Sequence, residues 1–198
     1  MGTFEEQSGV AGLFRACPRL ARPAALNRPT AAFVVGYLTH LVMDETWITA
    51  IYRPFFGERS PLGGDLRANI MDRALQFAMD GERRRDRALV AHVLDEVSRS
   101  DLGLEIDFID ADTLRRWQEL ILQVINHPPN WERFRYVAGR QLGEAGIKSE
   151  GAFQEFLRSL PDLVDETLRY LTPERVQAFM EDSLNRSLEA VKEYLECA

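Results

Sequence analysis

Apolar residues are densest between Arg28 and Tyr52, where the chain reads RPTAAFVVGYLTHLVMDETWITAIY. No Asp, Glu, Lys or Arg occurs from Thr30 to Met43, and apolar residues fall on every side of a helix drawn through this segment. Such a pattern is typical of a helix that is buried all round. Pro29 suits a first helical turn, with Asn27 or Thr30 as the capping residue. We therefore predict one buried central helix of about six turns, at 3.6 residues per turn.

The rest of the chain predicts further helices and no sheet. Residues 1–29 form a loosely structured lead-in with one short helix, and residues 53–64 form a loop that tucks Phe55 and Phe56 onto the core. The apolar spacing predicts helices over 65–79, 82–98, 112–126, 131–142, 149–160, 161–171 and 173–194. Helix starts are expected at Asp65, at Asp112 or Thr113, at Ser149 and at Thr172.

Two of these helices carry wide apolar faces, which we expect to pack inward. In the 112–126 helix the inward residues are Leu114, Trp117, Leu120, Ile121, Val124 and Ile125. In the last helix one seam holds Val176, Phe179, Met180, Leu184, Leu188, Val191 and Leu195. This seam is wide enough to pack against the body of the protein or another subunit, and we expect the body. The predicted fold class is all-α, a multi-helix bundle around the central helix.

We expect the chain to form a single helical domain over residues 1–198, since its length fits one domain. Within it, residues 1–29 are the lead-in, 30–126 the core and 130–198 the C-terminal helices.

A histidine and an aspartate interrupt the apolar segment one helical turn apart. Phe33, Tyr37, His40 and Asp44 share one stripe, continued by Trp47 and Ile51. Burying an ionised Asp without a partner costs several kcal/mol, so Asp44 needs a partner, a metal or solvent. The spacing i, i+4 lets His40 and Asp44 point at one centre, and zinc accepts both ligand types. The spacing alone favours the other interpretation, a buried hydrogen-bonded pair that orients the helix.

The stretch FVVGYLTHLVMDETW resembles the pattern aromatic-x-x-Gly-Tyr-Leu-x-His-Leu-x-x-Asp-x-x-Trp of the zinc-dependent phospholipase C family. The following IYRPFFG and the later FIDADTLRRWQELI extend the resemblance, which covers roughly Pro18 to Gln123. It implies an all-helical fold shared with fungal zinc nucleases and makes His40 and Asp44 zinc ligands, with Asp44 also bridging metals at the catalytic centre.

Further ligands of this family come as His-x-x-x-Glu, which His92 and Glu96 match in this chain. The local pattern favours another interpretation, a boundary histidine that touches Asp95 or Glu96. His127, beside two prolines, is expected in a loop. The family also takes a His and an Asp from upstream of the central helix, whereas nothing before His40 is His or Asp. Hence either an N-terminal ligand segment is missing, or the protein is a reduced relative.

Composition narrows the classes of function. Apolar residues at 45% and charged residues at 28% are ordinary for a soluble globular protein, and the net charge of −7 argues against nucleic acid as a partner. The basic run from Arg83 to Arg87 is expected to be a solvated helix face. No transmembrane segment and no secretory signal is evident, so we expect a cytoplasmic location. Cys17 and Cys197 suggest no disulfide framework.

Two hypotheses follow. In the first, the protein is a metal-dependent hydrolase resembling zinc-dependent phospholipase C, with His40, Asp44, His92 and Glu96 as metal ligands. Zinc would polarise a phosphoryl oxygen and activate its bound water, and the substrate would be a phosphodiester, either a small molecule or a phospholipid. In the second, the protein is a non-catalytic helical binding or scaffold protein with a degenerate metal site, where His40 and Asp44 survive as a hydrogen-bonded pair.

Overall fold

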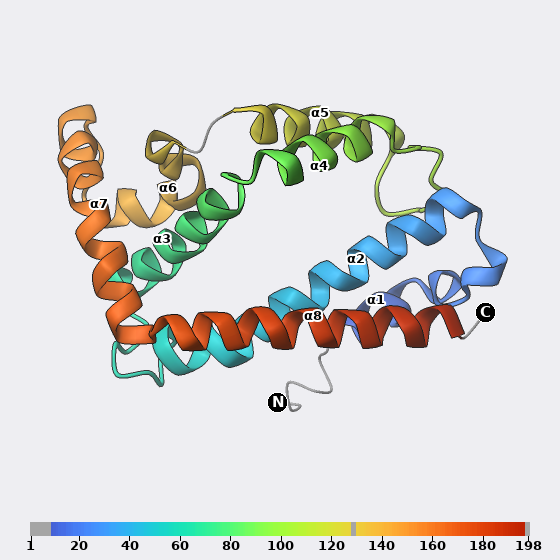
Figure 1. Cartoon of the computed structure of the whole chain (residues 1–198), viewed down its shortest axis with the longest axis horizontal. Helices are drawn as coiled ribbons and strands as arrows, with labels where there is room; N and C mark the ends of the chain where they lie inside the picture. The colour runs from blue at the N-terminus through green and yellow to red at the C-terminus, as the bar shows by residue number, and fades with distance from the viewer. Residues whose placement is uncertain (1–8, 128–129, 197–198) are drawn as a thin grey trace. The chain divides into compact units, whose positions relative to one another are not determined.

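A computed structural model of the chain describes residues 9–127 and 130–196, and the first eight residues of the predicted lead-in and Cys197 lie outside them. Helices account for all of the regular structure in these residues, which confirms the prediction of an all-α, multi-helix fold (Figure 1). None of the described helices combines the length and the hydropathy that a membrane span requires. The elements follow in chain order. They are α1 (Gly9–Ala16), η2 (Pro18–Ala21), η3 (Pro23–Ala25), α2 (Arg28–Thr46), η4 (Trp47–Phe56), α3 (Leu66–Arg83), α4 (Arg87–Arg99), α5 (Ala111–Asn126), η5 (Trp131–Arg133), α6 (Phe134–Glu144), α7 (Glu150–Leu171) and α8 (Pro173–Glu196).

The chain divides into two compact units. Unit 1 comprises Met1–Ile48, Leu94–Val124 and Phe179–Ala198, and unit 2 comprises Thr49–Val93 and Ile125–Ala178. The single domain over residues 1–198 expected from the sequence stays a prediction.

The core of unit 1 lies beside α2, where one apolar cluster joins α2 to the start of the chain and to α8. The stacked rings of Phe14 and Tyr194, with centroids 5.8 Å apart, connect α1 to α8 within this cluster. Trp47 meets Phe179 of α8 edge to face at 5.0 Å. The buried members of the cluster are Leu20, Val34, Leu38 and Tyr194.

In unit 2, α3 packs against α6 and α7. The aromatic contacts centre on Phe134, which is fully buried and meets Phe77 edge to face at 5.7 Å. Phe56 is also fully buried and Phe55 is half-buried, so the expected packing of both rings on the core is confirmed. The buried residues of the main cluster are Ala74, Phe134, Ala138, Leu142, Phe153 and Leu160.

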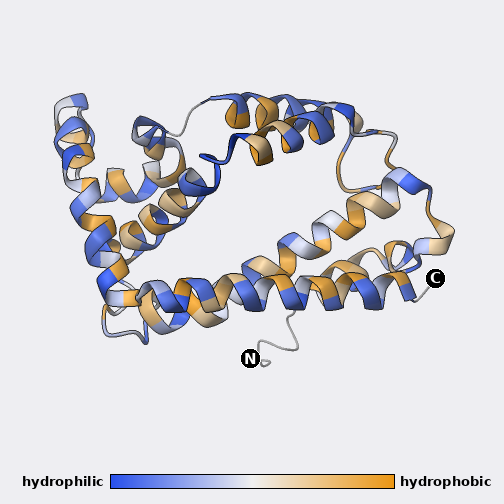
Figure 2. Ribbon diagram, viewed as in Figure 1, coloured by the Kyte–Doolittle hydropathy of each residue, from blue (hydrophilic) through white to orange (hydrophobic). Residues whose placement is uncertain are grey.

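The central helix differs from its prediction in two ways. It is α-helical only to Thr46 and continues as a π-helix to Phe56, so the expected loop begins later. Its buried residues also form one stripe, so the prediction of burial on all sides is wrong. The other faces are half-buried or exposed, as at Met43, which is 45% exposed, and Figure 2 shows hydrophobic and hydrophilic positions along the same helix. The buried stripe consists of Thr30, Val34, Leu38, Val42 and Thr46.

Helix ends were predicted best where a capping side chain marks them. Asn27, Asp65 and Ser149 each accept a backbone N–H three residues on, at 2.9, 2.7 and 3.2 Å. Two expected breaks are wrong: α3 runs through Gly81 to Arg83, and α7 runs through Pro161 to Leu171. A proline removes one intrahelical hydrogen bond, and the packing of α7 against α3 offsets that loss.

The apolar faces of α5 and α8 differ most from expectation. Trp117 and Leu120 of α5 are 60% and 51% exposed, and Leu184 and Leu188 of α8 are 61% and 49% exposed. The face of α8 that packs holds Phe179, Ser183 and Tyr194, so the expected inward seam is wrong for its leucines. Apolar residues cover more than one face of each helix, and the rest of the fold selects which face is buried.

Candidate functional site

The candidate site lies in unit 1, on the half-exposed face of α2. The start of α2 is fixed by the connection between α4 and α5, which lies against it. Asn27 donates from Nδ2 to the carbonyl oxygen of Gly103 at 3.0 Å, and the hydroxyl of Thr30 accepts the backbone N–H of Glu105 at 2.8 Å. Arg19 forms an ion pair with the Glu105 carboxylate. These bonds hold two segments far apart in sequence side by side.

Four rings follow this face of α2, and we call them the aromatic ladder: Phe33, Tyr37, His40 and Phe108. Phe33 and Tyr37 stack at 5.8 Å, and Tyr37 lies 6.2 Å from His40. Phe108, from the connection before α5, is 6.4 Å from both Phe33 and Tyr37 and is 43% exposed. The predicted stripe from Phe33 to His40 is therefore continuous, and it is partly open to solvent.

His40 and Asp44 lie together at the end of the ladder. The Nε2 atom of His40 is 3.4 Å from Oδ2 of Asp44, so both side chains point at a common region, as the i, i+4 spacing suggests. Each side chain is 56% exposed, which contradicts the expectation of a buried pair. Water can solvate both groups, so the pair needs neither a metal nor an internal partner to be stable.

A cavity of about 750 Å³ opens beside the first turns of α2, and we call it the α2 cavity. Its volume lies in the range of about 300–1,000 Å³ typical of ligand sites. Phe33 belongs both to this cavity and to the aromatic ladder, so the two features are continuous. The charged residues of its wall are Arg28, Glu96, Arg99 and Asp101. The apolar residues of its wall are Pro29, Ala32, Phe33, Leu102, Leu104 and Leu114.

The two remaining predicted ligands lie on α4. His92 and Glu96 are both exposed on α4, and Glu96 lines the α2 cavity. His127 is exposed just after α5, and its carbonyl oxygen accepts a hydrogen bond from Arg84. Of the predicted site residues, the structure thus places His40 against Asp44, and Glu96 in the cavity that Phe33 also lines.

This donor set does not fit a complete zinc site. Structural and catalytic zinc ions take at least three protein ligands. Over residues 9–127 and 130–196, no group of three or more His, Cys, Asp or Glu side chains is arranged to hold a metal ion. His40 and Asp44 supply only two of these donors.

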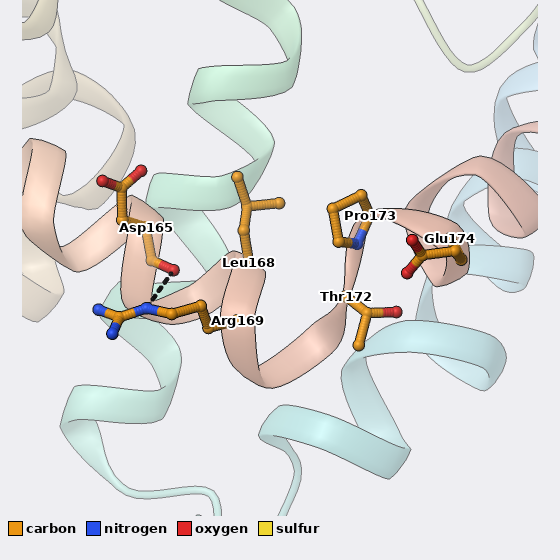
Figure 3. Close-up of a pocket in the computed structure, with 6 residues that line it drawn as sticks. All are labelled: Asp165, Leu168, Arg169, Thr172, Pro173 and Glu174. Atoms are coloured by element: carbon orange, nitrogen blue, oxygen red, sulfur yellow. Dashed lines mark hydrogen bonds between the residues drawn. The ribbon is translucent and has the colours of Figure 1, made fainter.

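A second cavity, in unit 2, lies where α7 meets α8 and measures about 560 Å³ (Figure 3). Its polar groups are bonded locally, since Arg169 donates from Nε to the carbonyl oxygen of Asp165 at 3.3 Å. Hydrogen bonds from the Glu174 backbone and from the Thr172 hydroxyl lower the pKa of Glu174. Arg169 and Glu174 thus have partners within the wall of this cavity, and no aromatic ring is among the described residues that line it, so we place the candidate site at α2.

Two notable residues escaped the sequence reasoning. Asp72 is 3% exposed within α3 and accepts a hydrogen bond from Gln76 at 2.9 Å, although the apolar spacing of that helix gave no sign of a buried carboxylate. Phe108 lies in the motif FIDADTLRRWQELI, yet no local pattern shows that its ring reaches α2. The sequence signal nearest to this contact is the pair of polar side chains at the start of α2, Asn27 and Thr30, which bond to the same connection between α4 and α5.

No family model, no curated protein and no solved structure matches this chain.

Proposed function

We propose that this chain is a non-catalytic helical binding protein whose ligand binds along α2, over the aromatic ladder and into the α2 cavity. The observation that carries the proposal is the continuity of the two features through Phe33. Small-molecule sites are concave and mostly apolar, with a few polar groups that orient the ligand. The α2 face of unit 1 offers this combination.

The exposure of the ladder supports a binding role. Phe108 is anchored to α2 through ring contacts with Phe33 and Tyr37, yet 43% of its surface remains in water. Half-exposed aromatic rings that are already held in place supply contact area at a low cost in conformational entropy. In this proposal His40 and Asp44 form a polar end to the ladder and act by hydrogen bonding, without chemistry.

A fluorescence titration with anilinonaphthalene sulfonate, an aromatic dye that brightens in apolar sites, tests the location. We expect one dominant site, weakened at least about fivefold by Phe108→Ala through loss of aromatic contact. Trp117→Ala is the matched control, because it removes a ring that is 60% exposed on α5 and outside the α2 cavity. If Trp117→Ala abolished dye binding and Phe108→Ala did not, the dye would bind elsewhere and the proposal would be overturned.

A second candidate is a zinc-dependent phosphodiester hydrolase resembling zinc-dependent phospholipase C. The observation that favours it is the 3.4 Å approach of His40 Nε2 to Asp44 Oδ2. Metal analysis of protein purified without chelator, together with hydrolysis of bis(p-nitrophenyl) phosphate, separates the two functions. Stoichiometric zinc and hydrolysis that are both lost in His40→Ala would establish the hydrolase. If the protein is instead a binding protein, we expect both the wild type and His40→Ala to be free of metal, inactive and unchanged in fold.

A further inference from the structure

We infer that the ligand of the α2 cavity is a small zwitterion with an apolar body, such as a free apolar amino acid. This inference rests on the proposed binding function and adds the chemical class of the ligand. Two opposite charges, Arg28 and Glu96, line one cavity together with apolar side chains, and this combination carries the inference.

The positive pole lies at the start of α2. Arg28 occupies the first turn of α2 and lines the cavity, and this turn contains no acidic residue. The dipole of a helix N-terminus adds positive potential to that of the guanidinium. A carboxylate of the ligand therefore has a favourable position beside Arg28.

The negative pole lies where α4 finishes, since Glu96 and Asp101 also line the cavity. Glu96 lies in the last turn of α4, where the helix dipole is negative, and Asp101 follows the helix. Arg99 also lines the cavity, but it forms an ion pair with Asp95, which leaves the acidic groups in excess at this end. An ammonium group of the ligand fits beside Glu96.

The side chains of Arg28 and Glu96 are the groups that remain for a ligand. Asp101 accepts the backbone N–H of Gly103 at 2.8 Å, and Arg99 is held by Asp95. Within residues 9–127 and 130–196, neither the Arg28 nor the Glu96 side chain forms a hydrogen bond or an ion pair. The wall carries two cationic and two anionic side chains, so a ligand without net charge matches it.

The apolar residues of the cavity wall select an apolar body. Phe33, Leu104 and Leu114 come from α2, from the connection and from α5, and all three line the cavity. A ring placed there meets Phe33, which already stacks on Tyr37. Burial of apolar area then favours an apolar amino acid over a small polar one.

Isothermal titration calorimetry with three matched compounds tests the inference near neutral pH. The compounds are phenylalanine, phenethylamine, which lacks the carboxylate, and phenylpropanoate, which lacks the ammonium group. We expect phenylalanine to bind at least about tenfold more tightly than either, because each deletion removes one hydrogen bond between charged groups. Equal affinity of phenylpropanoate and phenylalanine, or no binding of phenylalanine, would overturn the inference.

Two variants assign the poles. In Arg28→Gln we expect phenylalanine to bind no more tightly than phenethylamine, and in Glu96→Gln no more tightly than phenylpropanoate. Arg158→Gln and Glu155→Gln on α7, both exposed and outside the cavity, are the controls and should change none of the affinities. An equal loss of phenylalanine affinity in Arg28→Gln and Arg158→Gln, or in Glu96→Gln and Glu155→Gln, would contradict the assignment.

The dye titration keeps this inference separable from the proposed function. Dye binding that depends on Phe108, combined with no preference for phenylalanine, would refute the zwitterion and leave the binding protein intact. Absence of a dye site at α2 together with absence of phenylalanine binding would refute both.

Discussion

Arg186 of α8 donates a hydrogen bond from Nη1 to the hydroxyl oxygen of Thr46 on α2, at 2.9 Å. Thr46 is fully buried, and its hydroxyl in turn donates to the carbonyl oxygen of Val42 at 2.8 Å. The second guanidinium nitrogen, Nη2, lies 3.7 Å from Oε1 of Glu45. Arg186 therefore joins α8 to α2 within unit 1, at the point where α2 becomes a π-helix.

Replacing Arg186 with alanine should destabilise this junction. Hydrogen bonds to charged groups contribute about 1.5–3 kcal/mol. The Arg186 side chain is 40% exposed, so we expect a loss of about 1–2 kcal/mol in the free energy of unfolding. Urea denaturation followed by circular dichroism measures it. Arg158→Ala, which removes an exposed arginine of α7, should change that free energy by less than about 0.5 kcal/mol. Equal effects of the two variants would contradict a specific role for Arg186.

Two adjacent glycines before α3 allow the cost of a left-handed backbone to be separated from the cost of a steric clash. Gly63 and Gly64 both have positive φ, 68° and 66°. A Cβ at Gly63 would meet nothing within 4 Å, whereas a Cβ at Gly64 would lie 2.7 Å from the backbone nitrogen of Glu58. Alanine at either position incurs the left-handed penalty of about 1–2 kcal/mol.

Gly64→Ala should cost a further ~1–3 kcal/mol, because the Glu58 backbone must move. Thermal unfolding of the two alanine variants beside the wild type checks the order, and equal melting temperatures for Gly63→Ala and Gly64→Ala would contradict the close approach.

Asp110 should make the stability of α5 depend on acid pH. Its carboxylate accepts the backbone N–H and the hydroxyl of Thr113, both at 2.8 Å, and these bonds lower its pKa below the usual aspartate value, the backbone bond having the larger effect. A carboxylate whose pKa is lower in the folded protein than in the unfolded protein stabilises the folded state. This stabilisation is complete above the pKa of the unfolded state, and it is lost as the pH falls through the pKa of the folded state. Asp110→Ala should therefore destabilise the protein near neutral pH. The difference in the free energy of unfolding between the wild type and this variant should shrink below about pH 4.

Asp110→Asn supplies the control, because asparagine also caps helices but does not titrate. We expect the difference in the free energy of unfolding between Asp110→Asn and Asp110→Ala to stay constant across the same acid range, as measured by urea unfolding at each pH. A difference between wild type and Asp110→Ala that is also independent of pH would contradict the role of the carboxylate.

The caps and their neighbours explain which parts of the fold could be predicted from sequence. Asn27, Asp65 and Ser149 act within one turn of themselves, so a local pattern reveals them. The cap of α5 is Asp110 rather than Asp112 or Thr113, a shift of the kind that competing polar residues produce. The all-α class follows from such short-range signals.

Burial depends on residues far away in the chain, and there the prediction was wrong. The spacing of His40 and Asp44 gives their mutual approach, since four residues span one turn. It does not give their 56% exposure, which depends on which face of α2 meets α1, α8 and the connection before α5. For the same reason Trp117 and Leu184 were expected inside and lie largely in water.

Thr172, between α7 and α8, has φ 71° and ψ 141°, a conformation that a β-branched residue rarely adopts (Figure 3). Such strain costs about 1–3 kcal/mol, and glycine relieves it at an entropic cost of about 0.5–1 kcal/mol. We expect Thr172→Gly to raise the free energy of unfolding by about 1 kcal/mol, although the variant loses the hydroxyl that bonds to Glu174. Thr172→Ala also loses that hydroxyl but keeps a Cβ, so it should not stabilise the protein. Urea midpoints for the three proteins decide the matter: equal stabilisation by alanine and glycine would trace the effect to the hydroxyl and refute backbone strain as its cause.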